Sequence, residues 1–227
     1  MPCILPSTSL LAQNMVKAAI LGVYVLGILG LTKVLYGFMR KRGVPHNVAV
    51  YYNRKIVHMF AAGVVALLVP VFFGEAVTPT LLAFAFALLT YIPHKTGKLM
   101  YWFQTEENMY EVNFCIMWGI SLFLLWALTC NLWIAIFPAL MISFGDAVTG
   151  VVRNALFGRR TKHWAGNLAM LALVTPLGYA ILGPVGGVTA AASAIVERYE
   201  FPPIDDNVLI SLTCLVLLLA AWWLHLI

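Results

Sequence analysis

Asp146 is the residue whose position in this sequence most clearly implies chemistry. It lies inside the strongly apolar run IAIFPALMISFGDAVTGVV, residues 134–152. An aspartate near the centre of a membrane helix costs roughly 2.5–3.5 kcal/mol on an insertion scale and usually marks a functional site. A basic stretch follows directly, with cations at Arg153, Arg159, Arg160 and Lys162. A buried carboxylate beside several cations predicts a site for a metal ion and a phosphate group.

Small residues flank Asp146 at helical spacing. Asp146, Gly150 and Arg153 fall at positions i, i+4 and i+7, which lie on one stripe of a helix. Gly145 and Gly150 allow another backbone or a ligand to approach closely. We expect both glycines to line a phosphate-binding site together with Arg153, Arg159, Arg160 and Lys162. In the alternative interpretation, Asp146 is a structural partner of Arg153 or another cation, and the basic residues only fix the membrane topology.

A second basic motif is Arg54-Lys55-Ile56-Val57-His58, expected at the start of the second membrane span. On a helix, Arg54 and Lys55 precede His58 by four and three residues, so the three side chains share a face. That face could grip a phosphate. The alternative is anchoring of the span by the two cations, with His58 as an interfacial histidine.

The connecting segment 93–113 carries paired carboxylates. Glu107 and Glu111 are four residues apart and would face the same way on a helix, with Asn108 and Asn113 nearby. Paired carboxylates with an amide suit a Mg²⁺ site or a general base. A solvated connector without chemistry is the alternative.

A second acidic cluster precedes the last apolar segment. It comprises Glu197, Asp205, Asp206 and Asn207. One of the two aspartates is expected to cap the final helix. The cluster as a whole fits metal and nucleotide binding. The sequence contains no GxxxxGK[ST], GxGxxG or HExxH motif, so a nucleotide must be held by side chains and helix ends.

Composition places these motifs in a membrane. The chain of 227 residues is 62% hydrophobic and only 10% charged, whereas soluble domains carry about 25% charged residues. We predict an all-α, polytopic membrane helical bundle that forms a single integral membrane domain over residues 1–227. The segment 184–197 is short, so we expect 7–8 transmembrane helices, near residues 14–38, 56–73, 76–93, 112–130, 131–152, 164–182, 184–197 and 207–227.

Charge distribution predicts the orientation. Apart from Lys17 and Lys33, every Lys and Arg falls in or beside alternate connections between spans, and Glu75 is the one carboxylate on the other side. The positive-inside rule makes the charged side cytoplasmic. We expect a multi-pass protein, in the plasma membrane of a prokaryote, with its site facing the cytoplasm and with no nucleic-acid partner. This one-sidedness favours an enzyme, because a transporter would carry ionisable groups near mid-membrane or on both sides.

The motifs together resemble those of the CTP-dependent polyprenol kinase family, which includes dolichol kinase, phytol kinase and a CTP-dependent diacylglycerol kinase. The resemblance rests on R-K-x-x-H at Arg54, Lys55 and His58, on G-D-A at residues 145–147, on the basic segment ending at Lys162, and on D-N at Asp206-Asn207 after Glu197. Short prokaryotic, especially archaeal-type, members are the most similar. The family's K-[ST]-x-E-G-[ST] segment aligns with residues 162–167, where Ala165 replaces the glutamate and Asn167 the last hydroxyl residue.

The resemblance implies transfer of the γ-phosphoryl group of CTP to a membrane isoprenoid or lipid alcohol such as dolichol, phytol or geranylgeraniol. Mg²⁺ would be bound by Asp146, which is also catalytic, with Glu197, Asp205 and Asp206. The alcohol proton would go to His58, Glu107 or Glu111. The nucleotide phosphates would be held by Arg54, Lys55, Gly145, Gly150, Arg153, Arg159, Arg160, Lys162 and Asn207.

Two other functions remain open on the sequence. A CTP:phosphatidate-type cytidylyltransferase, which makes a CDP-lipid, uses the same nucleotide and metal, but its K-D, H-G-G and D-R-x-D signature is not found in this sequence. A transporter or channel predicts ionisable residues deep in several spans, and only Asp146 approaches that position. The choice between CTP and ATP is also open.

Overall fold

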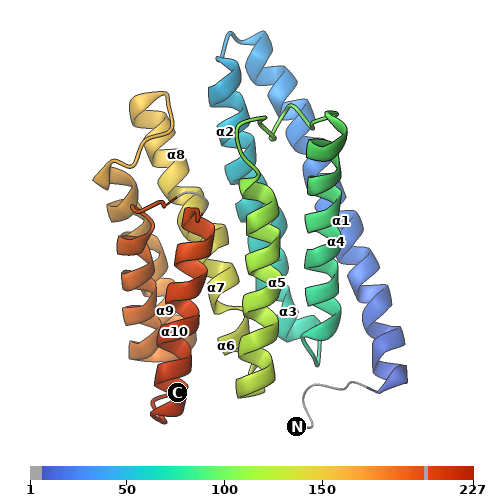
Figure 1. Cartoon of the computed structure of the whole chain (residues 1–227), viewed down its shortest axis with the longest axis vertical. Coiled ribbons are helices and arrows are strands. Elements are labelled where there is room, and N and C mark those ends of the chain that lie inside the picture. Colours follow the sequence, from blue (N-terminus) through green and yellow to red (C-terminus); the bar gives the residue numbers. More distant parts are fainter. Residues whose placement is uncertain (1–6, 202–203) are drawn as a thin grey trace.

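The chain folds into a bundle of long helices (Figure 1). The computed structural model describes residues 7–201 and 204–227. In this part, seven helical segments are long and apolar enough to cross a membrane, which confirms the predicted all-α membrane bundle. They are Thr8–Lys41, His46–Phe72, Val77–Thr96, Tyr110–Thr129, Leu132–Phe157, Trp164–Val196 and Asp206–Trp223.

Two of these segments are composite. The second joins α2 (His46–Ile56), the π-helical η1 (Val57–Gly63) and α3 (Val64–Phe72). The fifth joins α6 (Leu132–Ala135), α7 (Phe137–Leu140), the π-helical η2 (Met141–Gly145) and α8 (Asp146–Phe157). The others are single elements, namely α1 (Thr8–Lys41), α4 (Val77–Thr96), α5 (Tyr110–Thr129), α9 (Trp164–Val196) and α10 (Asp206–Trp223).

The two π-helical segments pack against each other in the middle of the bundle. A Cβ atom on Gly63 would lie 2.8 Å from the Phe144 ring, so the glycine lets that ring rest on the η1 backbone. His58 belongs to η1, and η2 ends where Asp146 begins α8. π-Helical turns inside α-helices occur frequently at functional sites. Here they set the positions of a buried histidine and a buried aspartate.

The helix α9 folds back on itself. Leu182 and Gly183 leave the helical conformation, and Gly183 has φ 60°. The side-chain amide of Asn167 donates to the Ala194 carbonyl at 2.7 Å, so residues 164–181 and 184–196 run antiparallel. A Cβ atom on Gly178 would lie 2.5 Å from the Gly186 carbonyl oxygen, which shows how closely the two halves pack. The short returning segment predicted near 184–197 is therefore present, and both ends of α9 lie at the same end of the bundle.

The connections segregate between the two ends of the molecule. The α1–α2 and α8–α9 connections lie at one end, whereas the α3–α4 turn and the C-terminal end of α10 lie at the other (Figure 1). Glu75, at the α3–α4 turn, accepts hydrogen bonds from the Asn14 amide at 2.8 Å and from the Thr78 N–H at 3.0 Å. The separation of most charges from Glu75, expected from the sequence, is thus found in the structure.

One predicted boundary is wrong. The second span was expected to begin near residue 56, which would have left Arg54 and Lys55 at its start. The helix instead begins at His46, so both cations lie within it and are buried, at 9% and 7% exposure. Hydropathy treats charged residues as interfacial, but carboxylates from other helices neutralise these two and allow the helix to continue around them.

Candidate functional site

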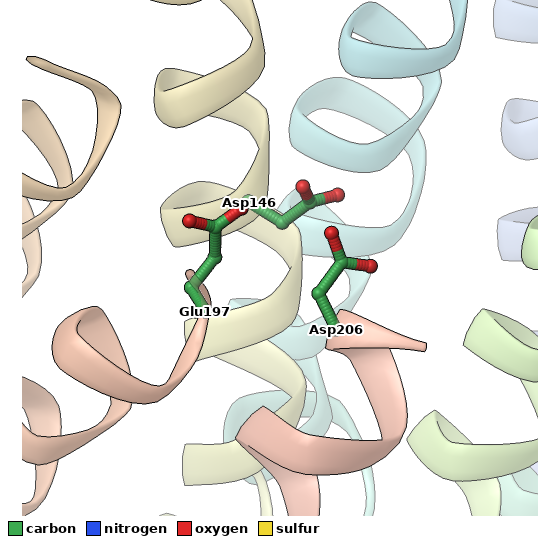
Figure 2. Close-up of side chains that lie close together, drawn as sticks. All are labelled: Asp146, Glu197 and Asp206. Carbon is green, nitrogen blue, oxygen red and sulfur yellow. The ribbon is translucent and has the colours of Figure 1, made fainter. Parts of the chain in front are cut away.

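Three carboxylates from three separate segments converge beside the junction of η2 and α8. Asp146 is the first residue of α8, Glu197 directly follows α9, and Asp206 is the first residue of α10. One oxygen of each lies within 4.8 Å of the others, and all three side chains are buried (Figure 2). Asp206 sits at a helix N-terminus, where the helix dipole favours a negative charge, whereas Asp146 lies within the continuous segment formed by η2 and α8. The structure thus brings together Asp146 with two members of the predicted second acidic cluster.

Asp146 is bound by two residues of the second span. The Lys55 ammonium donates to its two oxygens at 2.7 and 2.8 Å. His58 Nδ1 lies 3.0 Å from Oδ2, and the imidazole stacks on the Phe114 ring at 4.1 Å between centroids. Lys55 and His58 therefore meet the same carboxylate, whereas Arg54, the third member of the predicted shared face, pairs with Glu111. The cation that pairs with Asp146 is Lys55 rather than Arg153.

Gly150 makes room for this ion pair. A Cβ atom at this position would lie 2.8 Å from Lys55 Cδ and closer still to Cε, so the lysine side chain crosses the bare backbone of α8 on its way to Asp146. The group that approaches Gly150 is thus a lysine side chain, whereas a backbone or a ligand was expected. Gly145 is also closely packed, with Met170 Cε 2.5 Å from where its Cβ would lie.

The substitution Gly150→Ala is expected to displace Lys55 from Asp146. Overpacking of this kind typically costs about 1–3 kcal/mol, so we expect a lower melting temperature and reduced catalytic activity. The control is Gly30→Ala in α1, where a Cβ atom would meet nothing within 4 Å. Thermal unfolding of both variants in detergent checks the prediction. Equal melting temperatures for the two would contradict it.

Arg153 and Glu197 form a second buried pair. The guanidinium donates to both carboxylate oxygens, Nη1 to Oε1 at 2.7 Å and Nη2 to Oε2 at 2.8 Å. Arg153 is 1% exposed and also bonds Asn167 Oδ1 at 2.8 Å and the His163 carbonyl at 3.0 Å. Gly166 lies directly against the guanidinium. This geometry ties α8 to both ends of the folded-back α9.

Lys162 connects two of the three carboxylates. Its ammonium lies 2.7 Å from Asp206 Oδ2 and 3.2 Å from Glu197 Oε1. Burial lowers the pKa of Lys162, but Asp206 and Glu197 outweigh that effect and raise it above its ordinary value. The side chain is therefore a full positive charge within the acidic cluster. Lys55 and Lys162 together place two ammonium groups beside carboxylates that could also bind a metal ion.

Counting acceptor positions shows which carboxylates can bind a metal ion. A carboxylate offers about four lone-pair positions. Glu197 accepts from Arg153 twice, from Lys162 and from the Asn167 amide at 3.2 Å, so its two oxygens are fully used. Asp146 accepts twice from Lys55 and once from His58, so one of its positions is left, whereas Asp206 accepts once each from Lys162 and the Asn207 N–H, so two are left. Oxygen ligands of this type suit Mg²⁺, and Asp146 and Asp206 are the better placed to supply them.

Asp205 lies outside this cluster. Its Oδ1 caps α10 by accepting from the Val208 N–H at 3.0 Å, and its Oδ2 accepts from the Asn113 amide at 3.0 Å. Burial and the charge of Asp206 raise the pKa of Asp205 to about 6. The expectation that one aspartate caps the last helix is met by Asp205. Its predicted role as a metal ligand has no support in this geometry, because among the described residues the carboxylates close enough to share a metal ion are Asp146, Glu197 and Asp206.

The neighbouring aspartates give a matched test. We expect Asp206→Asn to weaken the binding of Mg²⁺ strongly, because it removes a carboxylate charge from the cluster and the partner of Lys162. Asp205→Asn keeps a side chain that can cap α10 and should bind Mg²⁺ like the wild type. Mg²⁺ binding to both variants is measured by titration calorimetry in detergent. Equal loss of Mg²⁺ binding in the two variants would refute the separation of roles.

Glu111 organises a second polar cluster. It accepts from His94 Nε2 at 2.6 Å, from Gln104 Nε2 at 2.8 Å and from Arg54 Nη2 at 3.5 Å. Arg54 also donates to Asn108 Oδ1 at 3.2 Å. Arg54 therefore faces Glu111, while Lys55, the next residue, pairs with Asp146.

Glu107 does not join Glu111. The predicted shared helical face is wrong, because α5 begins at Tyr110 and Glu107 lies in an exposed turn before it. The spacing of four residues implies a common face only when the helix includes both residues. In the structure, Glu111 alone is buried and surrounded by donors.

The remaining predicted phosphate ligands, Arg159, Arg160 and Asn207, lie in different surroundings. Arg159 is exposed, and Arg160 pairs with Glu200 at 2.7 Å and lies over the Tyr110 ring. Asn207 is 1% exposed, and its Oδ1 is a buried acceptor without a hydrogen-bond partner in the part of the chain that the structure describes. Arg160 is thus paired with Glu200 at the surface, whereas Asn207 lies beside the carboxylates.

Sequence reasoning did not assign site roles to Asn167, His94 and Gln104. Asn167 holds both Arg153 and Glu197, and His94 and Gln104 hold Glu111. Polar residues in apolar segments, such as Asn167 in the first turn of α9, are the one sequence signal that could have identified them. Comparison with known proteins adds nothing to these assignments, because no family model, curated protein or solved structure matches the chain.

Proposed function

We propose that the protein is a Mg²⁺-dependent kinase that transfers the γ-phosphoryl group of CTP to a membrane lipid alcohol. The observation that supports this most directly is the convergence of Asp146, Glu197 and Asp206 within 4.8 Å, interleaved with Lys55 and Lys162. Phosphoryl transfer requires mainly positioning and neutralisation of phosphate charge. A cluster of oxygen ligands and mobile ammonium groups has the composition for both tasks.

Each charged group has a defined task in this proposal. Asp146 and Asp206 would hold the metal ion, which would neutralise charge on the phosphate oxygens. Lys55 and Lys162 would move from the carboxylates to the phosphates, since their long side chains are flexible and their charges are strongly attracted to phosphate. Arg153 and Glu197 keep their mutual pairing and hold α8 against the ends of α9. The two lysines would thus release the aspartates when the nucleotide binds.

The alcohol would react at the side of the cluster where His58 lies. The hydroxyl oxygen forms a bond to the γ-phosphorus, and the bond from that phosphorus to the oxygen bridging to CDP breaks. The hydroxyl proton passes to His58 or to Glu111, and the products are a lipid monophosphate and CDP. Both side chains border an apolar pocket between the helices, so either could meet a hydroxyl carried by a lipid.

The proposed orientation has the site at the cytoplasmic surface of a prokaryotic plasma membrane. It rests on the positive-inside rule and on the gathering of the charged connections at one end of the bundle (Figure 1). A nucleotide would arrive from water at that end, while the lipid alcohol stays in the bilayer. The expectation that Asp146 alone would lie deep in a span is wrong, because Arg54, Lys55, Glu111 and Arg153 are also buried within spanning segments. The depth of the ionisable residues therefore no longer disfavours a transporter.

The test uses the purified full chain in detergent micelles, γ-labelled CTP or ATP, Mg²⁺ and a panel of lipid alcohols that includes geranylgeraniol, phytol, dolichol and a diacylglycerol. We expect label in the lipid fraction with CTP and at least one alcohol, and none when EDTA removes the metal. Absence of labelled lipid with every alcohol and both nucleotides would overturn the proposal.

A further inference from the structure

An apolar pocket lies beside the charged clusters, and the nucleotide site proposed above does not use it. Four membrane-spanning elements wall it: α1, η1 with the start of α3, α4 and α5. Its walls are almost entirely hydrocarbon, with Leu29, Ala62, Leu82, Phe86 and Trp118 among them. A pocket with such walls between membrane helices has the chemistry of a binding site for a hydrocarbon chain.

The pocket is polar at one end only. Arg54, His58 and Glu111 border it there, together with Thr90 of α4. The opposite end is bordered by Pro79 and Trp118. From Thr90 to Pro79 the pocket follows eleven residues of α4, or about 16 Å at 1.5 Å per residue. This is roughly half of the hydrocarbon thickness of a bilayer, so the pocket suits a chain with a polar head at one end.

One side chain separates this polar end from the carboxylate cluster. His58 borders the pocket, and its Nδ1 lies 3.0 Å from Asp146 Oδ2. Its ring is fixed by stacking on Phe114, which also lines the pocket. Glu111 is held by three donors, His94, Gln104 and Arg54. A hydroxyl at this end would meet His58 and Glu111 within reach of the proposed phosphate site.

We propose that this pocket binds the hydrocarbon chain of the acceptor alcohol, with the hydroxyl at His58 and Glu111. The inference rests on the proposed function for the identity of the acceptor as an alcohol. A second apolar hollow lies between α4 and α5, around Val77 and Phe123, and has no charged residue on its walls. Of these two pockets, only the first has a polar end where a hydroxyl could bind, so the site fits an alcohol with a single chain better than a glycerolipid with two.

The test compares two alanine-to-phenylalanine variants. Ala62→Phe places a ring inside the pocket, whereas Ala85→Phe places the same ring on the exposed side of α4, outside the pocket. We expect the KM for geranylgeraniol to rise about tenfold or more in Ala62→Phe, because displacing about two methylene groups from an apolar site already costs that much affinity. The KM for CTP should stay unchanged. In Ala85→Phe both constants should equal those of the wild type.

A second measurement needs no variant. A photoreactive geranylgeraniol analogue is crosslinked to the wild-type protein, and the labelled peptides are identified by mass spectrometry. We expect labels within residues 57–65 and 82–86, competed by unlabelled geranylgeraniol. Two outcomes would overturn the pocket assignment but not the kinase function. One is labels confined to lipid-facing positions. The other is equal KM values for the two variants while the wild type phosphorylates the alcohol. Competed labels in the pocket without phosphorylation of any alcohol would support the pocket and overturn the kinase function.

Discussion

Asp146→Asn is expected to lower the rate of lipid phosphorylation by a factor on the order of 10³, the size of effect seen when one preorganised electrostatic group is removed from an active site. The aspartate binds Lys55 and His58 and lies in the carboxylate cluster. An asparagine keeps the shape but supplies no charge for the metal ion or for the lysine. Initial rates with γ-labelled CTP and geranylgeraniol, at saturating Mg²⁺, give the comparison.

The control measurements show whether the Asp146→Asn protein keeps the wild-type fold. Asp146→Asn should elute as a single species on size exclusion and should still bind the photoreactive lipid, because the pocket lies on the other side of His58. A folded Asp146→Asn protein that turns over at the wild-type rate would show that Asp146 does not hold the metal ion. The aspartate would then be only the structural partner of Lys55.

Arg153→Met is expected to destabilise the protein by about 3–5 kcal/mol, the usual cost of breaking a buried ion pair by removing one partner. Glu197 would keep its charge at 1% exposure, and the Lys162 ammonium at 3.2 Å would be its one remaining ionic partner. The double variant Arg153→Met/Glu197→Leu removes both charges and should recover most of the loss. Thermal and denaturant unfolding in detergent measure the three proteins.

The unfolding of these three proteins shows whether Arg153 has a structural role. A single variant as stable as the wild type would show that the guanidinium is not a structural tie between α8 and α9. A double variant no more stable than the single one would show that Lys162 and Asn167 depend on Glu197 for the packing of this region. In the proposed function, Arg153 holds α8 against α9, and Lys55 and Lys162 bind the phosphates.

Local pattern was sufficient for most of the fold. Long apolar runs predict the spans because each must satisfy its own backbone hydrogen bonds in a bilayer, and the short segment after Gly183 returns along α9 as expected. The start of the second span could not be predicted in this way. Arg54 and Lys55 are neutralised by Glu111 and Asp146, which lie far along the chain, and hydropathy contains no information on such pairs.

The sequence indicated which residues would gather at the site, but not which of them would pair with each other. Sequence spacing brings Lys55 and His58 to one face, and both meet Asp146. It cannot show that Lys55 and Asp146, 91 positions apart, form an ion pair, or that Arg153 binds Glu197, 44 positions away. The shared face of Glu107 and Glu111 was predicted wrongly because it depends on where α5 begins, and which aspartate caps the last helix depends on where α10 begins.

The proposed activity is transfer of the γ-phosphoryl group to a lipid alcohol. Purified protein is incubated with Mg²⁺ and geranylgeraniol, once with CTP labelled at the α-phosphate and once with CTP labelled at the γ-phosphate. We expect lipid-bound label only from the γ position, with CDP as the second product. Lipid-bound label from the α position, with release of pyrophosphate, would rule out the kinase and identify cytidylyl transfer instead.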